Sequence, residues 1–487
     1  EVEWSSQLPD VVERTGYAGD FHLAGQWFPK IARLEPSGTW VHFPFHPHAE
    51  FYADFGEYDV TLDVPSRMVV GATGERVTSE LVGDRRRDRY VARDVHDFAF
   101  TAWPDFVTVE EQIDGVHATV LSPRGQRAAT EATLRALRHG LPFLGARFGR
   151  YPYPTLTVVH PPDSAPAAGG MEYPGFITTG GPVLAAHATS FIERITLHEL
   201  AHQWFQGLVA TDEHRHPALD EGLASYAESL ALRSLEGPGD GLRLGGLEVS
   251  GDAWFRALAA RAEQDGPVGR AAAEFATFQE LAGLVYARTA TALETIARTW
   301  GEDLLVRAVG RYARRHRFDH PGPRHLLAAI REVVGEDAAE VLRAVLVEGA
   351  TIDFAVEAPR TLPLRAAAGV FDEGGKRKTR AAAPPSGRHL GRVLVRRRGA
   401  LRVPVVIELE FEDGTRERRP WDARATSVEL ELESASPLVA AVVDPELHVP
   451  LDADLSNNSA TRRPGGTSRL VERAAYVGAL AASVLGP

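Results

Sequence analysis

The chain has 487 residues and a formal net charge of −13, from 53 Lys and Arg against 66 Asp and Glu. This acidic balance argues against nucleic acid as the main partner, because phosphate binding needs a basic face. The chain has no cysteine, which excludes a disulfide scaffold, a cysteine nucleophile and a thiolate metal site. Its length exceeds that of one ordinary core, so we expect several domains.

The first part of the chain, residues 1–127, is predicted to be a β domain. Segments 57–65 and 117–123 alternate or run apolar, with turn residues between them. From residue 128 the hydrophobic period becomes helical, and a mostly helical domain is expected over 128–355, with a strand at 155–162. The order of elements predicts an α+β protein of several domains.

The last third of the chain returns to strand patterns. Residues 356–388 are rich in charge, Gly and Pro, and are predicted to form a linker. A small C-terminal β domain is expected over 389–458. Within it, 403–421 alternates between apolar and polar residues and predicts a hairpin that turns at Asp413-Gly414.

A tail, residues 459–487, completes the predicted organisation. Its apolar end, 474–487, has two interpretations, a final packed helix or the beginning of a membrane-associated helix. The chain has no run of about eighteen apolar residues, the length that a membrane-spanning helix needs.

The stretch "HELAHQWF", residues 198–205, has the spacing of a zinc site. On a helix, His198 and His202 lie on one face and can both direct a ring nitrogen at one ion. Glu199 then lies beside the metal without binding it, which suits a general base acting on water. The alternative is that these are ordinary helix residues that match the pattern by chance.

Catalytic zinc usually takes a third protein ligand. Eighteen residues separate His202 from Glu221, which lies in "ALDEGLASYAE" at the start of a second predicted helix. Glu228 is seven residues further on, on nearly the same helix face, where it could orient a zinc-bound histidine. The predicted ligand set is therefore His198, His202 and Glu221, with one zinc ion per chain.

These motifs resemble the aminopeptidase N family of zinc metallopeptidases, in the gluzincin group. The resemblance rests on "HELAHQWF" with its following glutamate, and extends to "FGRYPYPTLTVV" at 148–159 and "VYARTATAL" at 285–293. "GGMEYPGFITTG" at 169–180 is similar to the Met-Glu-Tyr-Pro variant of the bacterial branch, in which Tyr173 replaces the family's more usual asparagine.

The resemblance implies a β-sandwich N-terminal domain, a thermolysin-like catalytic domain, and further β or helical domains. It implies that Glu172 anchors the α-amino group of the substrate, and that Gly169, Gly170 and Met171 form an edge strand on which the peptide lies. It implies that Tyr286 hydrogen-bonds the developing oxyanion. The first β domain is shorter than that of the family, so we expect its opening part to be missing.

The resemblance also implies the activity. We expect removal of the N-terminal residue from peptides with a free N-terminus, by a water that zinc activates and from which Glu199 takes a proton. One alternative is an endopeptidase of the same zinc class. Another is a scaffold with the same fold and no chemistry. Members of the bacterial branch are often exported or membrane-associated, which predicts the cell envelope.

Overall fold

The computed structural model describes residues 1–462, except 11, 181–189, 238–239, 245–246, 261–265, 383 and 385. The chain divides into two compact units. The first holds residues 1–294 and 302–347, and the second holds 295–301 together with the chain from 348 onwards. The expected tail, residues 459–487, is wrong in its first residues, because 459–461 form a strand that pairs with 440–442; its part from 463 onwards lies outside the described residues. None of the described helices combines the length and the apolar character needed to cross a membrane.

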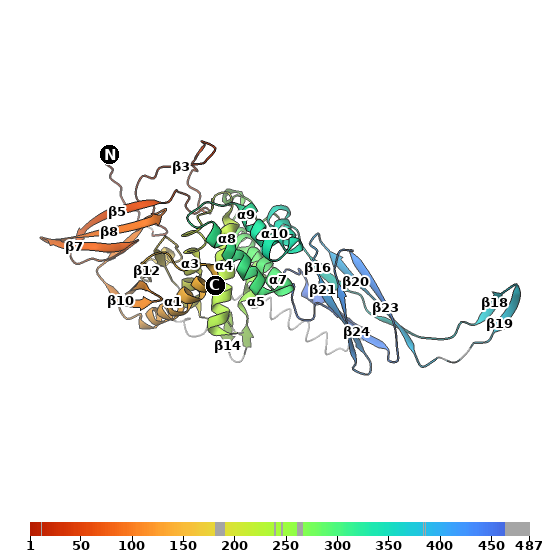
Figure 1. Ribbon diagram of the computed structural model, residues 1–487. Coiled ribbons are helices and arrows are strands. Elements are labelled where there is room, and N and C mark those ends of the chain that lie inside the picture. The colour runs from red at the N-terminus through yellow and green to blue at the C-terminus, as the bar shows by residue number, and fades with distance from the viewer. Residues whose placement is uncertain are drawn as a thin grey trace. The chain divides into compact units, whose positions relative to one another are not determined.

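The N-terminal region of the first unit consists of antiparallel strands (Figure 1). A four-stranded sheet has the order β1 (Gly16–Ala18), β2 (Phe21–Ala24), β9 (Phe100–Trp103), β6 (Val69–Ala72). A three-stranded sheet has the order β5 (Gly56–Pro65), β8 (Arg85–Val95), β7 (Glu75–Val82). β3 (Arg33–Leu34) and β4 (Trp40–Val41) form a separate short pair. Buried residues of both larger sheets, such as Leu62 and Val70, share one hydrophobic cluster. The β-rich start predicted from the alternating pattern is therefore present.

A mixed sheet connects this region to the helices. Its order is β10 (Phe106–Ile113), β11 (Val116–Pro123), β12 (Thr155–Val159), β13 (Phe176–Thr178). β10 and β11 are antiparallel, whereas β11, β12 and β13 run parallel, so that α1 (Arg127–Phe148) forms the crossover from β11 to β12. The boundary expected at residue 127 therefore does not separate two compact units, because strands on both sides of it hydrogen-bond in one sheet.

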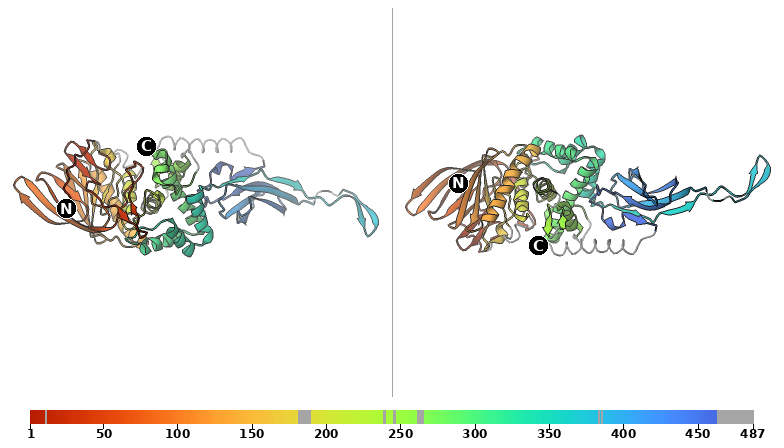
Figure 2. Two further views of the ribbon diagram at one scale, coloured as in Figure 1. Left: turned by 90° about the horizontal axis from the view of Figure 1, so that it is seen from above. Right: turned by 90° about the horizontal axis from the view of Figure 1, so that it is seen from below.

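The rest of the first unit is mainly helical, as expected (Figure 2). In both views of Figure 2 the strands of the N-terminal region lie on one side of these helices. The elements are α3 (Phe191–His202), α4 (Glu221–Glu236), β14 (Leu242–Leu244), β15 (Leu247–Val249), α5 (Gly251–Ala260), α6 (Phe278–Leu281), the π-helical segment η5 (Ala282–Arg288), α7 (Thr289–Trp300), α8 (Glu302–Arg315), α9 (Pro323–Val333) and α10 (Glu336–Glu348). The part of α7 from residue 295 and the last residue of α10 belong to the second unit. α3 packs between α1 and α4, and α3 and α4 are the two helices that carry the predicted zinc ligands.

The second unit contains two four-stranded antiparallel sheets. One joins β16 (Asp353–Val356), β17 (Arg360–Pro363), β20 (His389–Arg398) and β23 (Ser427–Ser434). The other has the order β22 (Arg416–Trp421), β21 (Val405–Phe411), β24 (Leu438–Val443), β25 (Ser459–Thr461). The hairpin predicted at Asp413-Gly414 is confirmed, because β21 and β22 pair around it and Gly414 has a φ of 83°.

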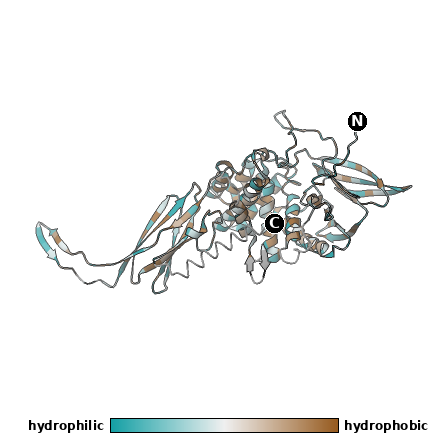
Figure 3. Ribbon diagram, turned by 180° about the vertical axis from the view of Figure 1, so that it is seen from behind, coloured by the Kyte–Doolittle hydropathy of each residue, from teal (hydrophilic) through white to brown (hydrophobic). Residues whose placement is uncertain are grey.

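The linker predicted over 356–388 is wrong in part. β17 lies within it and pairs with β20, and β18 (Gly369–Glu373) and β19 (Lys376–Arg380) form a hairpin. The Gly374-Gly375 pair that suggested a linker is the turn of this hairpin, with positive φ at both residues. The composition misled because the hairpin is largely hydrophilic (Figure 3), as exposed strands of a two-stranded ribbon can be.

Candidate active site

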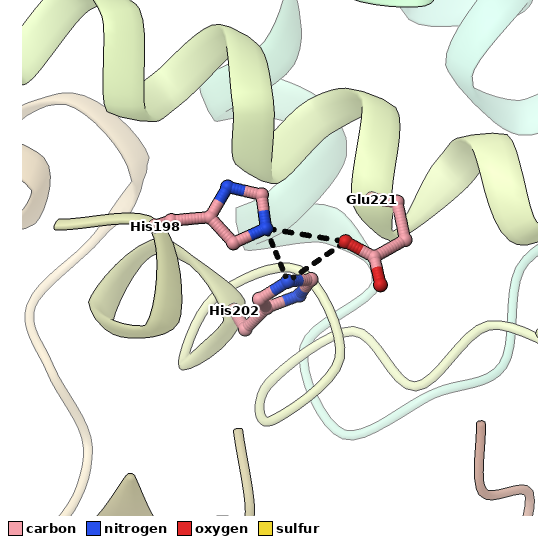
Figure 4. Close-up of side chains that lie close together, drawn as sticks. All are labelled: His198, His202 and Glu221. Carbon is pink, nitrogen blue, oxygen red and sulfur yellow. Dashed lines mark hydrogen bonds and ion pairs between the residues drawn. The ribbon is translucent and has the colours of Figure 1, made fainter. Parts of the chain in front are cut away.

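The three predicted zinc ligands come together although they lie on two helices. His198 and His202 are one turn apart near the end of α3, and Glu221 is the first residue of α4. Nε2 of His198, Nε2 of His202 and Oε2 of Glu221 form a triangle in which each pair of atoms is 3.2 Å apart (Figure 4). The side chains converge from three directions on one point, as a metal site requires.

The size of this triangle fits a zinc ion. Zinc binds imidazole nitrogen and carboxylate oxygen at roughly 2.0–2.2 Å in tetrahedral sites, and the ligand atoms of such a tetrahedron are roughly 3.3–3.5 Å apart. The chemistry of the donors fits as well, since catalytic zinc takes histidine and glutamate together. Two imidazole nitrogens that face each other at 3.2 Å also need a shared partner, which a cation between them provides.

Carboxylates behind the histidines fix their orientation. Nδ1 of His198 donates to Glu228 at 3.0 Å, and Nδ1 of His202 donates to Asp220 at 2.5 Å. In both rings Nε2 is thereby left to face the metal position. Glu228 also pairs with Arg194, which holds the carboxylate in place. The sequence reasoning named Glu228 for this place and missed Asp220, whose position directly before Glu221 was the available signal.

Glu199 lies beside the triangle rather than in it. Its side chain is 5% exposed, and burial raises its pKa to about 7 against the opposing effect of His198 and His202. Gly170 approaches it so closely that a Cβ at position 170 would be 3.7 Å from Oε1 of Glu199. The predicted base therefore faces the predicted substrate strand.

The segment 169–172 extends the mixed sheet at its β13 side. Gly170 and Met171 donate to the carbonyl of Thr178 at 2.8 and 3.3 Å, and Thr178 donates back to Met171 at 2.8 Å. Gly170 has a φ of 77°, a conformation that L side chains rarely adopt. Met171 thus forms an isolated antiparallel β-bridge with Thr178 at the edge of β13, and Gly169 and Gly170 lead into it without forming a strand.

Tyr286 reaches the site from the π-helical segment η5. Its ring stacks on His198 with ring centroids 5.9 Å apart and an interplanar angle of 13°. Its hydroxyl donates to Oε1 of Glu221 at 2.5 Å. The structure therefore places the predicted oxyanion donor next to the metal ligands, with its proton directed at a ligand carboxylate.

An acidic cluster of Glu50, Glu172 and Glu213 lies near the metal triangle, and only Glu172 was predicted from the sequence. One carboxyl oxygen from each of Glu50, Glu172 and Glu213 lies within 4.8 Å of the others. Burial raises the pKa of Glu172 and Glu213 well above the usual value, and raises that of Glu50 to about 8. Glu50 and Glu213 come from irregular segments distant in sequence from Glu172, where no local pattern marked them.

Tyr173 stands where the family has asparagine, and its side chain contacts Phe51 and Arg14. It is 1% exposed, packs against Phe51 with the rings stacked, and donates its hydroxyl to the carbonyl of Arg14 at 2.9 Å. Arg14 in turn forms an ion pair with Glu50. Tyr173 thus supports the acidic cluster through Arg14.

Comparisons with known proteins agree with this site. Residues 133–345 match the model of the Peptidase family M1 domain. Aminopeptidase 2 of Candida albicans is 26% identical over 326 residues, which cover 64% of this chain and 34% of that protein. Aminopeptidase N of Acetobacter pasteurianus is 32% identical over 130 residues, which cover 25% of this chain and 36% of that protein. The chain therefore spans about a third of the length of these curated relatives.

A solved structure shares the fold. Aminopeptidase A of Legionella pneumophila, in complex with aspartic acid, aligns with a TM-score of 0.62 at 13% sequence identity, covering 91% of this chain and 49% of that one. The Met-Glu-Tyr-Pro variant as a mark of the bacterial branch stays a prediction. The resemblance to the aminopeptidase N family is confirmed, because residues 133–345 match the Peptidase family M1 domain and the similar curated proteins are aminopeptidases.

Proposed function

We propose that the protein is a zinc-dependent aminopeptidase that hydrolyses the N-terminal peptide bond of peptides with a free N-terminus. The observation that carries the proposal is the triangle of His198, His202 and Glu221, with ligand atoms 3.2 Å apart and Glu199 beside them. The helices around it, built on the mixed sheet, fit the thermolysin-like catalytic domain that the resemblance implies.

His198, His202 and Glu221 would hold the zinc ion, and Asp220 and Glu228 would orient the two rings. When bound, zinc supplies a Lewis acid that polarises the scissile carbonyl and lowers the pKa of water. Glu199 takes a proton from the attacking water and later delivers it to the leaving amine, so one carboxylate is in turn base and acid. Burial favours the protonated form of Glu199, which suits a carboxylate that takes up a proton and then returns it.

The remaining side chains position the substrate and stabilise charge. Tyr286 turns its hydroxyl from Glu221 to the oxyanion that develops on the carbonyl, where a hydrogen bond in a water-poor site is most effective. Gly169, Gly170 and Met171 offer backbone groups to an extended peptide, which adds a strand to the sheet. Glu172, 5% exposed and with Oε1 lacking a hydrogen-bond partner among the described residues, pairs with the α-ammonium group.

Two alternatives make different predictions. An endopeptidase of the same zinc class would cleave peptides whose N-terminus is blocked, and Glu172 would then have no ammonium group to bind. A scaffold without chemistry would not need Glu199, although Glu199 and all three predicted ligands are present. Peptides are the proposed partners in either enzymatic case, and association with the cell envelope stays a prediction.

The first test is metal content with its effect on turnover. We expect about one zinc per chain in the wild type and loss of zinc in His202→Ala. Glu199→Gln should keep zinc, because Glu199 is not a ligand, and lose on the order of a thousandfold or more in turnover of aminoacyl amides. Active protein without a transition metal, or a Glu199→Gln variant with near-normal turnover, would overturn the assignment.

The second test separates aminopeptidase from endopeptidase. An aminoacyl amide is compared with its N-acetylated form, in the wild type and in Glu172→Ala. Removing one partner of a buried charge pair costs roughly 2–5 kcal/mol, so the variant should lose most of the wild-type preference for the free amine. Equal cleavage of acetylated and free substrates by the wild type would replace the proposal with the endopeptidase.

A further inference from the structure

A cavity of the first unit shares no lining residue with the proposed active site. Its volume is about 360 Å³, within the range of roughly 300–1,000 Å³ that is usual for small-molecule sites. It is formed by the turn between β10 and β11, by the segment between α1 and β12, and by the segment that follows α8. The lining residues are 150–154 together with Gly115, Val116 and Arg317. The cavity is therefore large enough for a small organic molecule.

The polar side-chain groups that this cavity offers to a ligand are guanidinium groups. The tyrosine hydroxyl protons are already used within the protein, since Tyr151 donates to the carbonyl of Thr155 at 3.0 Å and Tyr153 donates to the carbonyl of Asp94 at 2.9 Å. The other lining side chains are those of valine and proline, and none of the described lining residues carries a carboxyl group. The cavity therefore combines cations with apolar surface, which suits an anion that has an apolar part.

Arg150 and Arg317 carry these guanidinium groups. Among the described residues, neither guanidinium has a hydrogen-bond or ion-pair partner. Arg150 lies against the β10–β11 turn, where a Cβ added to Gly115 would be 2.8 Å from its Nη2. Arg317 lies over the ring of Phe318, with Cζ 4.8 Å from the ring centroid. Two cations that lack an anionic partner in the described part of the chain thus line one cavity, in a protein whose formal net charge is −13.

Two further arginines add positive charge next to this cavity. Nη1 of Arg314 donates to the carbonyl of Arg147 at 2.9 Å, and a Cβ added to Gly149 would be 3.4 Å from Cγ of Arg314. Arg147 itself lies over the ring of Phe143, with Cζ 3.4 Å from the ring centroid. Neither arginine forms an ion pair with a carboxylate of the described residues. The group of four arginines therefore favours an anion at the cavity.

A phosphate monoester has the chemistry that these side chains recognise. Its phosphate group carries about −1.5 to −2 charges at neutral pH, which matches two arginines. A planar guanidinium binds phosphate oxygens through two parallel hydrogen bonds, so Arg150 and Arg317 can both take part. The tyrosine and proline rings of 151–154 offer apolar surface to the organic part of the ester. A carboxylate brings a single charge and leaves one of the two arginines without a partner.

We propose that this cavity binds a small organic phosphate. Arg150 and Arg317 pair with the phosphate group, and the rings of 151–154 pack against the organic part. The proposal is independent of the proposed aminopeptidase function, because no residue of the metal site lines the cavity.

Two rivals give the same residues another meaning. Asp114 precedes Gly115 and could neutralise Arg150, although the two side chains form no ion pair in the structure. The zinc ion of the active site also accepts phosphate oxygens, so binding measured on the whole protein could belong to the metal. Variants of the two arginines separate both rivals from the proposal.

The test measures binding of phenyl phosphate, inorganic phosphate and phenylacetate to the zinc-containing protein, by isothermal titration calorimetry at about 0.15 M ionic strength. We expect one phenyl phosphate per chain with a Kd of about 1 mM or lower, and weaker binding of the other two, because only phenyl phosphate combines a dianion with a ring. Arg150→Gln and Arg317→Gln should each weaken this binding by roughly tenfold, and the double variant should abolish it.

The matched control is Arg124→Gln, which removes a guanidinium that is 71% exposed elsewhere in the first unit and should leave the affinity unchanged. Arg150 and Arg317 are themselves exposed and have no described partner to lose, so their variants should unfold at the temperature of the wild type.

Every other result overturns the proposal in a recognisable way. No binding of phenyl phosphate to the wild type removes the site. Binding that survives in the double variant and disappears when a chelator removes zinc assigns the phosphate to the metal. Loss of binding in Arg317→Gln alone shows that Arg150 is neutralised. Equal affinity for phenylacetate or for inorganic phosphate overturns the class of ligand. None of these results bears on cleavage of aminoacyl amides, so the proposed function is tested separately.

Discussion

Asp220 should control how tightly the protein holds zinc although it is not a ligand. Its carboxylate is fully buried and accepts the Nδ1 proton of His202 at 2.5 Å, and His202 is 1% exposed. Such partners raise the basicity of the ring and fix its tautomer, and their loss typically costs 10–100-fold in metal affinity. Substitution of Asp220 therefore tests the site without touching a ligand.

The structure narrows the expected loss of zinc affinity in variants of Asp220. Nδ1 of His202 also lies 3.2 Å from the carbonyl oxygen of Phe205, so in Asp220→Ala the proton keeps an acceptor and the tautomer survives. What is lost is the charged partner, and we expect about 30-fold weaker zinc binding, equivalent to about 2 kcal/mol. Asp220→Asn keeps a neutral acceptor and should lose no more than about tenfold.

Zinc affinity is measured by competition with a chromophoric chelator at neutral pH. Because Asp220 also forms a buried pair with His202, its removal should destabilise the zinc-free protein as well, so zinc affinity is measured at a temperature at which thermal unfolding shows each zinc-free variant to be folded. Glu228→Gln is the matched comparison. Its carboxylate is shared with Arg194, and we expect a smaller loss than in Asp220→Ala. Affinity of Asp220→Ala within threefold of the wild type would refute this account of how His202 is held.

Three further predictions concern other parts of the first unit. Burial lowers the pKa of His96 to about 3, so the folded state stays neutral while the unfolded state binds a proton below its pKa of about 6.5. The wild type should therefore lose about 2 kcal/mol of unfolding free energy between pH 7.5 and 5 through this residue, a loss absent from His96→Gln in chemical denaturation at both pH values. In Gly222→Ala, the new Cβ would lie 2.4 Å from Cγ2 of the buried, β-branched Thr289, and we expect thermal denaturation to show a loss of about 1–3 kcal/mol; an unchanged midpoint would contradict this. Tyr286→Phe should keep zinc and lose roughly a hundredfold or more in turnover of aminoacyl amides, and near-normal turnover would show that its hydroxyl serves only to hold Glu221.

The metal ligands could be predicted because their geometry is local. His198 and His202 lie one turn apart on a helix whatever the rest of the chain does, and Glu221 begins the next helix of the pattern. The helical period also predicted that Glu228, seven residues after Glu221, lies on the same face of its helix. Helical period and ligand chemistry together leave few arrangements for such residues.

The acidic cluster could not be predicted, because its geometry depends on the tertiary fold. Glu50 and Glu213 lie in irregular segments whose sequences carry no period, and only the packed structure brings them to Glu172. Which strands share a sheet also depends on the tertiary fold and cannot be predicted from local sequence. β10 and β11 look like a continuation of the first β region, yet β11 pairs with β12 after a helical crossover.

The direction in which Tyr286 points from its helix depends on the number of residues in the π-helical segment η5. Each hydrogen bond of a π turn spans one residue more than in an α-helix. Such turns arise when a single residue is inserted into an ordinary helix. Deleting one residue from 282–285 would let α-helical spacing return, and the tyrosine would rotate by roughly 100° around the axis, away from the ring of His198. Between relatives, the position of this tyrosine can therefore change through a one-residue gain or loss several positions away, with every residue in contact with the metal ligands left as it was.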